Sequence, residues 1–412
     1  MTFLFLSLVL LSSFVFCLFV AVRYRWLMMP MMVGFFFRIV LIVLDYNEIF
    51  SPPGGNADAL VFTRRAFEWS QLDWPNLFAT FNYSASYVYS TIGAIFFKTF
   101  GAHNLVLPSL NFLAGMIVIF LAASMTYDLW GRKPAIISAY IMALFPFAAF
   151  NSVIALREEF SILVFLMGLF FFLKWVSGKG FAWICIAFLF FPMAVMIHPG
   201  WIGAVVGVAL YLAYFSARLV LSSFKGAVTN RRNISKLISS VAVLFISLAF
   251  IAGSGGITLA KGITIGGESE EEGVADLIES RFEKDPLGGS AYPGFVATGN
   301  PYTQPWLIPV RVFYFMFSPF PWDIRSPRHA LGMVAMLMYS FLAWRLYKGW
   351  PVVKKKDECI ALLLIFGALV FIFSIGVTNI GTAIRHRTKF LGLFVILAAS
   401  SFNSLKIRFR KS

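Results

Sequence analysis

The chain has 412 residues, of which 59% are hydrophobic and only 13% are charged. No soluble core can bury so much apolar surface, so the composition excludes an ordinary soluble protein and predicts a membrane protein. The net charge of +15 is a property of many nucleic-acid-binding proteins, but the Lys and Arg residues lie in short runs between apolar stretches. This pattern is typical of membrane topology, and we expect no nucleic-acid partner.

Apolar stretches of membrane-spanning length recur along the whole sequence. They predict an all-α, polytopic transmembrane helix bundle with about eleven spans, in which residues 1–412 form a single transmembrane domain. No cleavage motif follows the first stretch, so we expect it to be a retained helix. The predicted spans cover residues 3–22, 27–44, 104–127, 134–150, 160–176, 181–197, 201–217, 237–253, 330–347, 359–377 and 388–404.

The order of the basic clusters predicts the topology. They occur at 23–25, 132–133, 174–179, 218–236, 345–356 and 406–411, after every second predicted span. The positive-inside rule then gives an outer N-terminus and a cytoplasmic C-terminus in a multi-pass protein of the cell inner (plasma) membrane. The apolar segment 84–101 would invert every later loop if it crossed, so we expect it to form an interfacial or re-entrant helix on the outer side.

Two long segments are predicted to lie outside. The first outer loop, 45–103, begins with a Pro/Gly turn (SPPGGN), and interfacial helices follow from an N-cap at Asn56. The large outer loop, 254–329, contains an acidic amphipathic stretch and then a Pro- and aromatic-rich segment. Its prolines are incompatible with a regular spanning helix.

Charged and polar residues gather at the predicted outer ends of the spans. Charges so close to hydrocarbon are costly, which favours a functional role over a passive one. The candidate site residues are Asp45, Glu48, Asp58, Arg64, Arg65, Arg157, Glu158, Glu159, His198, Arg325, Arg385, His386 and Arg387.

The cations of this set are candidates for binding an anion. Outer cations violate the positive-inside rule unless an anion compensates them, and guanidinium groups bind phosphate bidentately. We therefore predict donor-phosphate binding by Arg157, Arg325, Arg385, His386 and Arg387, with pairing to outer acids as the alternative. Arg64, Arg65, Glu158, Glu159 and His198 are predicted to contact other parts of the substrate, although His198 before a proline is also typical of a simple turn.

The carboxylates supply the second half of the chemistry. We predict Asp58 as the general base, with Asp45 and Glu48 as alternatives. As alternatives, Asp58 complements the dipole of its helix, and Asp45 and Glu48 simply mark the membrane boundary. A hydrophobic, phosphate-linked sugar suits such a site, because its phosphate would lie at headgroup level and leave with arginine stabilisation. One base facing the leaving phosphate implies inversion at the anomeric carbon.

Several segments resemble the GT-C glycosyltransferases, a superfamily of membrane enzymes that includes protein mannosyltransferases and the aminoarabinose transferases of lipid A. The resemblance rests on SYVYSTIGAIFFKTFGAHNLVLPSLNFLAGMIVIFLAASMTYDLWGRKPAIISAYIMALFP, on LREEF at 156–160 and on GTAIRHR at 381–387, the last two similar to bacterial polysaccharide-pathway members. It implies a polyprenyl-phosphate- or pyrophosphate-linked sugar as donor, a glycan or lipid as acceptor, membrane lipids as surroundings, and an inverting reaction. No cofactor is required with certainty, and a divalent metal is compatible with this chemistry.

Three other functions remain open. An O-antigen or exopolysaccharide polymerase or ligase would also use outer arginines. A transporter or flippase of lipid-linked substrates would need polar groups at mid-membrane and broken helices, whereas most charges here lie at the rim. A structural scaffold would not need the outer cationic turn at 385–389. The three cysteines lie in apolar stretches without metal-ligand spacing and predict no disulfide.

Overall fold

The computed structural model describes residues 2–55, 58–82, 87–224, 234, 236–238, 240, 257–259, 263–265, 290–297, 304–324 and 327–405. This part of the chain is helical apart from one antiparallel hairpin, which pairs β1 (Ile257–Leu259) with β2 (Ile263–Ile265). The hairpin belongs to the predicted large outer loop, most of which lies outside the described residues, as does the predicted N-cap Asn56. Helical structure is thus confirmed as the fold class.

Seven helices among the described residues are long and apolar enough to cross a membrane. They correspond to seven of the predicted spans, because continuous apolar sequence of that length folds as one helix. Six of them are single helices: α1 (Thr2–Arg23), α6 (Val106–Trp130), α9 (Arg157–Val176), α11 (Ile202–Phe224), α16 (Pro327–Val353) and α17 (Asp357–Ile375). The seventh joins the 3-10 turn Arg25–Leu27 to α2 (Met28–Tyr46).

The remaining predicted spans are shorter or broken. Residues 134–150 form α7 (Arg132–Leu144) and α8 (Pro146–Asn151), separated at Phe145, because Pro146 forces its predecessor into an extended conformation. Residues 388–404 follow α18 (Ile380–Thr388) as α19 (Leu391–Ala398) and a 3-10 segment, Ala399–Ser404. The span predicted at 181–197 is the 16-residue helix α10 (Ala182–Ile197), and that at 237–253 lies almost entirely outside the described residues.

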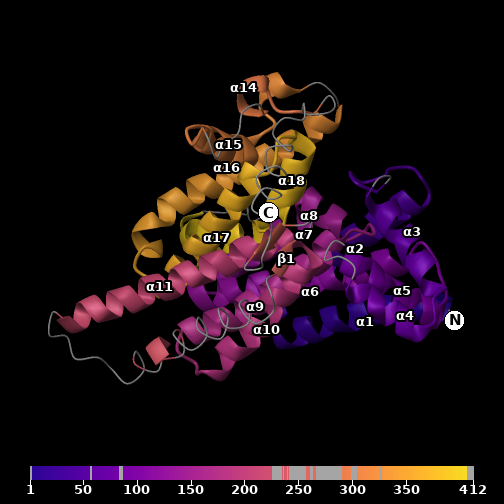
Figure 1. Cartoon of the computed structure of the whole chain (residues 1–412), viewed down its shortest axis with the longest axis horizontal. Coiled ribbons are helices and arrows are strands. Elements are labelled where there is room, and N and C mark those ends of the chain that lie inside the picture. The colour runs from indigo at the N-terminus through magenta and orange to yellow at the C-terminus, as the bar shows by residue number, and fades with distance from the viewer. Residues whose placement is uncertain are drawn as a thin grey trace, which may run out of the picture.

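Short helices occupy the two segments predicted to lie outside. In the first, α3 (Asp58–Ser70), α4 (Trp74–Ala79) and α5 (Val88–Phe100) lie together beside the N-terminus at one end of the molecule (Figure 1). The Lys98 ammonium on α5 donates to the Leu72 carbonyl at 2.5 Å, which ties α5 to the end of α3. In the second, α14 (Gly294–Ala297) and α15 (Leu307–Phe317) lie at another edge of the bundle.

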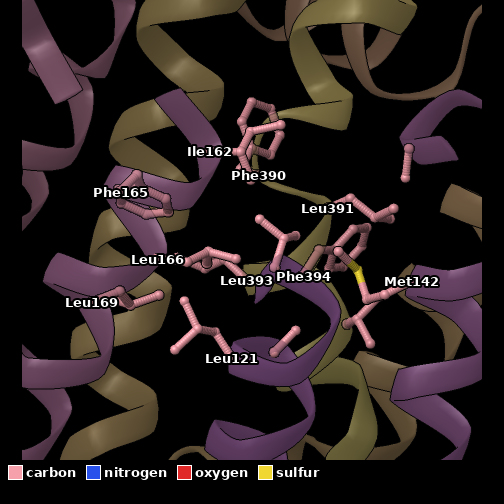
Figure 2. Close-up of a cluster of buried hydrophobic side chains, with 14 of the residues drawn as sticks. Leu121, Met142, Ile162, Phe165, Leu166, Leu169, Phe390, Leu391, Leu393 and Phe394 are labelled. Carbon is pink, nitrogen blue, oxygen red and sulfur yellow. The ribbon is translucent and has the colours of Figure 1, made fainter. Parts of the chain in front are cut away.

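The helix α19 lies in the middle of the bundle. All of its residues from Leu391 to Ala398 are buried, as expected for a helix that is apolar on every side. Figure 2 shows its Leu393 and Phe394 among side chains of α6, α7 and α9, including Leu121, Met142 and Leu166. This interior packing fixes the position of α18, which directly precedes α19 and carries the cationic turn.

Buried arginines hold the ends of helices that stop inside the protein. Arg38 on α2 donates to Met142 and Ala143 at the end of α7, at 3.3 and 2.9 Å. Arg311 on α15 donates to carbonyls of α14 and to that of Ile375, the last residue of α17. The last four carbonyls of a helix lack partners within it and carry the negative end of the dipole. Each guanidinium therefore supplies donors to helix-end carbonyls that hydrophobic packing alone would leave unpaired.

Two glycines allow α11 to approach α17 closely. A Cβ on Gly207 would lie 2.3 Å from the Ile365 Cα, and one on Gly203 would lie 3.0 Å from the Leu369 Cα. Small residues four apart are typical of close helix pairs in membranes. We expect Gly207→Val to separate these helices and lower the thermal unfolding temperature. Gly367→Val, on α17 but with no neighbour within 4 Å of its Cβ position, should change it little; equal losses in the two variants would contradict this interpretation.

Candidate functional site

A polar cluster forms where α3, α9 and α18 meet, and it contains Asp58, Glu158, Arg385, Lys389 and the two histidines described below. Arg385 Nη1 donates to a carboxylate oxygen of Asp58 in a short contact, and Arg385 Nε lies 3.3 Å from Glu158 Oε1. These residues are remote in the sequence, because Asp58 and Arg385 are 327 positions apart. The fold thus joins the first predicted outer loop to the last predicted outer turn.

The local structure of α18 decides which of its cations reach the cluster. The Asn379 carboxamide oxygen caps the helix by accepting from the Gly381 and Thr382 amides at 2.9 and 3.3 Å. Residues four apart share a helix face, so Arg385 and Lys389 point the same way. Arg387, two positions on from Arg385, points away. The cap therefore sets the rotation of α18 as well as its starting point.

Arg387 lies outside the polar cluster. It is fully buried, its Nη1 donates to the Phe315 and Met316 carbonyls at 3.1 and 2.8 Å, and its guanidinium stacks over the Tyr339 ring. These contacts cap α15 in the way that Arg38 caps α7. The prediction that Arg387 binds phosphate is therefore not supported by its position, and we assign it a structural role.

Glu158 joins the two cations of the α18 face. Its side chain is 2% exposed, and its Oε1 lies 3.3 Å from Arg385 Nε and 3.6 Å from Lys389 Nζ. The neighbouring Glu159 is also buried but lies beside Gly115 and acts electrostatically on Arg38. The side chains of adjacent helix residues point in directions about 100° apart. Glu158 and Glu159 of the REE turn therefore reach two different places. Only its first carboxylate belongs to the polar cluster.

Arg157 and Arg385 form the cationic side of the cluster. The Arg157 guanidinium lies over the Phe62 ring, 5.4 Å from its centroid, and interacts electrostatically with Glu158 and Asp58. Burial disfavours the charge of Arg385, but the attraction of Glu158 and Asp58 outweighs burial and raises the pKa of Arg385. Arg385 is therefore a permanent cation, and its side chain keeps 28% exposure on the cavity side.

Two histidines and a lysine form the inner part of the cluster. Lys389 Nζ lies 2.6 Å from His198 Nε2 and 2.9 Å from His386 Nδ1, and its side chain is completely buried. His198 comes from the turn after α10, where its Nδ1 accepts from the Gly200 amide at 3.1 Å. His386 packs against the Phe373 ring of α17 and keeps partial exposure. Both histidines were predicted site residues, whereas Lys389 was not assigned a role from the sequence.

Two cavities adjoin the cluster. One, of about 590 Å³, is lined by Asp45 and Glu48 at the end of α2 and by Ala59, the residue after Asp58. The other, of about 310 Å³, is lined by Arg385 and by the start of α18. The turn between α2 and α3 separates them, since Gly54 lines the second cavity and Gly55 the first. Volumes of this order accommodate small ligands or the polar part of a lipid.

The other predicted residues lie apart from the cluster. Arg65 contacts Glu68 at 3.9 Å and lies over the Trp69 and Tyr87 rings, so it stabilises the α3 region. Arg64 is exposed on the same helix. Arg325 lies outside the described residues, so its predicted role is untested. Among the described residues, no group of three or more His, Cys, Asp or Glu side chains could hold a metal ion.

The geometry brings together an always-charged guanidinium, a buried carboxylate, an ammonium or amine group and two imidazoles, next to a cavity with two further carboxylates. Such a set can bind an anion and move a proton. Comparisons with known protein families, with curated protein sequences and with solved structures found no match to this chain.

Proposed function

We propose that this protein is a GT-C-type membrane glycosyltransferase that moves a sugar from a polyprenyl-phosphate or pyrophosphate donor to a glycan or lipid acceptor. The observation that carries the proposal is the position of Arg385. It joins Asp58 and Glu158 and also lines a cavity of about 310 Å³, next to a cavity of about 590 Å³ lined by carboxylates. A phosphate bound by Arg385 would have a carboxylate-lined space beside it for the sugar and its acceptor.

In this proposal Arg385 holds the donor phosphate and stabilises it as the leaving group. Arg157 adds a second positive charge nearby. Asp58 is engaged by Arg385 and serves to orient it. We therefore transfer the role of general base to Asp45, which lines the larger cavity, with Glu48 as the alternative. Attack by the acceptor oxygen from the side of Asp45 inverts the anomeric carbon, and the acceptor proton passes to the carboxylate.

We further propose that the broken segments also cross the membrane. Asn111 near the start of α6 donates to the Ile154 and Leu156 carbonyls, so α7 and α8 return the chain from the far end of α6. The segment after Arg385 ends where Lys133 donates to the Asn403 and Leu405 carbonyls, at the end of the bundle remote from Glu158. With α10, which packs against α9, and the seven long helices, these segments would give ten crossings among the described residues. The eleventh predicted span, 237–253, lies almost entirely outside them.

The orientation follows from the cations at the end remote from the polar cluster. There Lys356 donates to the Leu129 carbonyl at 2.6 Å, Arg218 pairs with Asp357 at 2.7 Å, and Lys133 lies nearby in the chain. The positive-inside rule makes this end cytoplasmic and the cluster external, in a cell inner membrane. A donor lipid would then bring its phosphate to the polar cluster from the outer leaflet.

Ligand binding tests the function without knowledge of the sugar. Farnesyl phosphate carries the phosphate and isoprenoid of the proposed donor, and farnesol lacks the phosphate. We expect the purified protein in detergent to bind farnesyl phosphate at least about tenfold more tightly than farnesol, because one charge-assisted contact contributes about 1.5–3 kcal/mol. Microscale thermophoresis measures both affinities. Equal affinities, or binding of neither, would contradict the proposal.

Labelling of single cysteines tests the orientation. In a variant whose native cysteines are replaced by serine, Glu48→Cys should react with a membrane-impermeant maleimide in intact cells. Lys348→Cys should react only after the cells are opened, because it is exposed near the opposite end of α16. The reverse pattern would show that the cluster faces the cytoplasm.

A further inference from the structure

Lys389 is the most enclosed charged group of the polar cluster. Its side chain has no solvent exposure, and its nitrogen is surrounded by groups from three elements and one turn. Glu158 and Arg157 face it from α9, Arg385 and His386 from its own side of α18, and His198 from the turn after α10. The Phe373 ring of α17 covers it, 5.4 Å from ring centroid to nitrogen. The proposed mechanism does not use this group.

The hydrogen bonds around His198 indicate which protons are present. Nδ1 accepts from the Gly200 amide, so a neutral ring carries its proton on Nε2. Nε2 is the atom that faces Lys389 Nζ at 2.6 Å. A lysine ammonium has only donors, and two donors cannot form a hydrogen bond. A neutral amine satisfies the pattern, because it accepts from His198 and donates to His386 Nδ1 at 2.9 Å.

The charges of the cluster agree with this arrangement. Arg157 and Arg385 balance Asp58 and Glu158, so a charged Lys389 would leave a buried net positive charge. Complete burial disfavours the charged form of Lys389, Glu158 opposes this effect and Arg385 reinforces it. Burial and the neighbouring cations also lower the pKa of both histidines. A phosphate that binds at Arg385 adds negative charge to a site that is balanced when Lys389 is neutral. A positive charge on Lys389 would then be favoured.

We propose that Lys389 is a neutral amine in the resting protein and takes up one proton when an anionic phosphate binds at Arg385. The proton comes from solvent through His386, whose ring is partly exposed. The new ammonium pairs with Glu158 Oε1, which lies 3.6 Å away in the resting protein, and gives up the hydrogen bond from His198 Nε2. The second half of this proposal rests on the proposed function, whereas the resting state does not. Lys389 is thus a positioning residue that adjusts the charge of the site to its ligand.

The resting state is tested without any ligand. A lysine that is neutral in the folded protein and charged in the unfolded chain releases a proton on folding. Its contribution to stability therefore rises with pH until the pH reaches the pKa of lysine in the unfolded chain, about 10.4. We expect the unfolding temperature of the wild type, minus that of Lys389→Met, to rise steadily from about pH 7 to pH 9.5. Lys348→Met, at an exposed lysine, should give a constant difference. A constant difference for Lys389→Met would overturn the neutral amine.

A second variant covers the case in which Lys389→Met fails to fold. His198→Asn removes the donor at Nε2 but keeps an oxygen that can accept from the Gly200 amide, as asparagine does in Asx turns. Without that donor, Lys389 gains more from being charged. We expect the rise of the unfolding temperature with pH to become smaller in His198→Asn than in the wild type. An unchanged or steeper rise would overturn the proposed hydrogen-bond pattern.

Proton uptake on binding tests the coupling. Isothermal titration with farnesyl phosphate at pH 8, where the ligand is already a dianion because its second pKa is about 6, is repeated in buffers of different ionisation enthalpy. We expect the wild type to take up about one proton per ligand more than Lys389→Met. Binding without this difference overturns the coupling but leaves the proposed function intact. Absence of binding contradicts both, while the unfolding temperatures still decide the resting state.

Discussion

Arg385→Gln is expected to reduce sugar transfer by about 100-fold or more and the affinity for farnesyl phosphate by about tenfold or more. The change removes the cation that lines the cavity, and removal of one strong donor to a developing oxyanion costs about 2.7–4 kcal/mol. The affinity is compared between folded proteins, because the variant also leaves the buried Glu158 without its nearest cation and should lose some stability. Transfer is measured as release of polyprenyl phosphate once a donor is found, and binding is measured beforehand.

Arg387→Gln is the matched control for this variant. It removes the same charge from the same helix, two positions further on, but from a side chain that caps α15 through the Phe315 and Met316 carbonyls. We expect it to lower the unfolding temperature while each folded molecule keeps its affinity for farnesyl phosphate. If both variants lost affinity to the same extent, the division of the two arginines between site and scaffold would be wrong.

Arg38→Met should destabilise the protein by about 3–5 kcal/mol, the usual cost of removing one member of a buried charged network. The guanidinium donates to Ser152 Oγ at 2.8 Å and to the Ala143 carbonyl at 2.9 Å, and it is 1% exposed. Its loss would leave the end of α7 without donors and Glu159 without its nearest opposing charge. The free energy of unfolding in detergent, measured by denaturant titration, checks this value.

Two further variants separate charge from packing at Arg38. Arg25→Met, at an exposed position before α2, should have little effect on unfolding. Glu159→Gln in the Arg38→Met background should leave the stability of Arg38→Met nearly unchanged, because burial favours the protonated, neutral form of Glu159 once Arg38 is gone, while the carbonyls of α7 remain unpaired. If the double variant were clearly more stable than Arg38→Met alone, an uncompensated Glu159 charge would be part of the cost of losing Arg38.

Sequence patterns predicted the long helices because continuous apolar stretches of about twenty residues have one outcome in a membrane. They failed at 134–150 and 388–404, where the hydrophobicity is sufficient but the backbone changes direction. Pro146 was visible as a break signal at the first of these. At the second, the helix is interrupted at Lys389 and Phe390, and neither residue is a break signal in the sequence. Length and composition thus predict apolar segments better than they predict single helices.

The candidate site was predictable as a set of residues but not as an arrangement. Sequence reasoning found Asp58, Glu158 and Arg385, because charges beside apolar spans are conspicuous. It could not separate Arg385 from Arg387, since the rotation of α18 follows from the Asn379 cap and from the packing of α19. Lys389 was recognised as part of the outer cationic turn at 385–389 but was given no role of its own. Its four-residue spacing from Arg385 was the signal that could have identified it.

The central position of α19 has a consequence for how the protein is made. Its residues are enclosed by α6, α7, α16 and α17, yet it is inserted after all of these helices. The earlier helices are therefore in the bilayer before α19 is inserted, and lipid tails would fill the space between them until then. Arg385 and Lys389 arrive with the same segment, so a nascent chain has neither the anion-binding charge nor its proton acceptor. Biogenesis would thus delay the proposed activity until the bundle is closed.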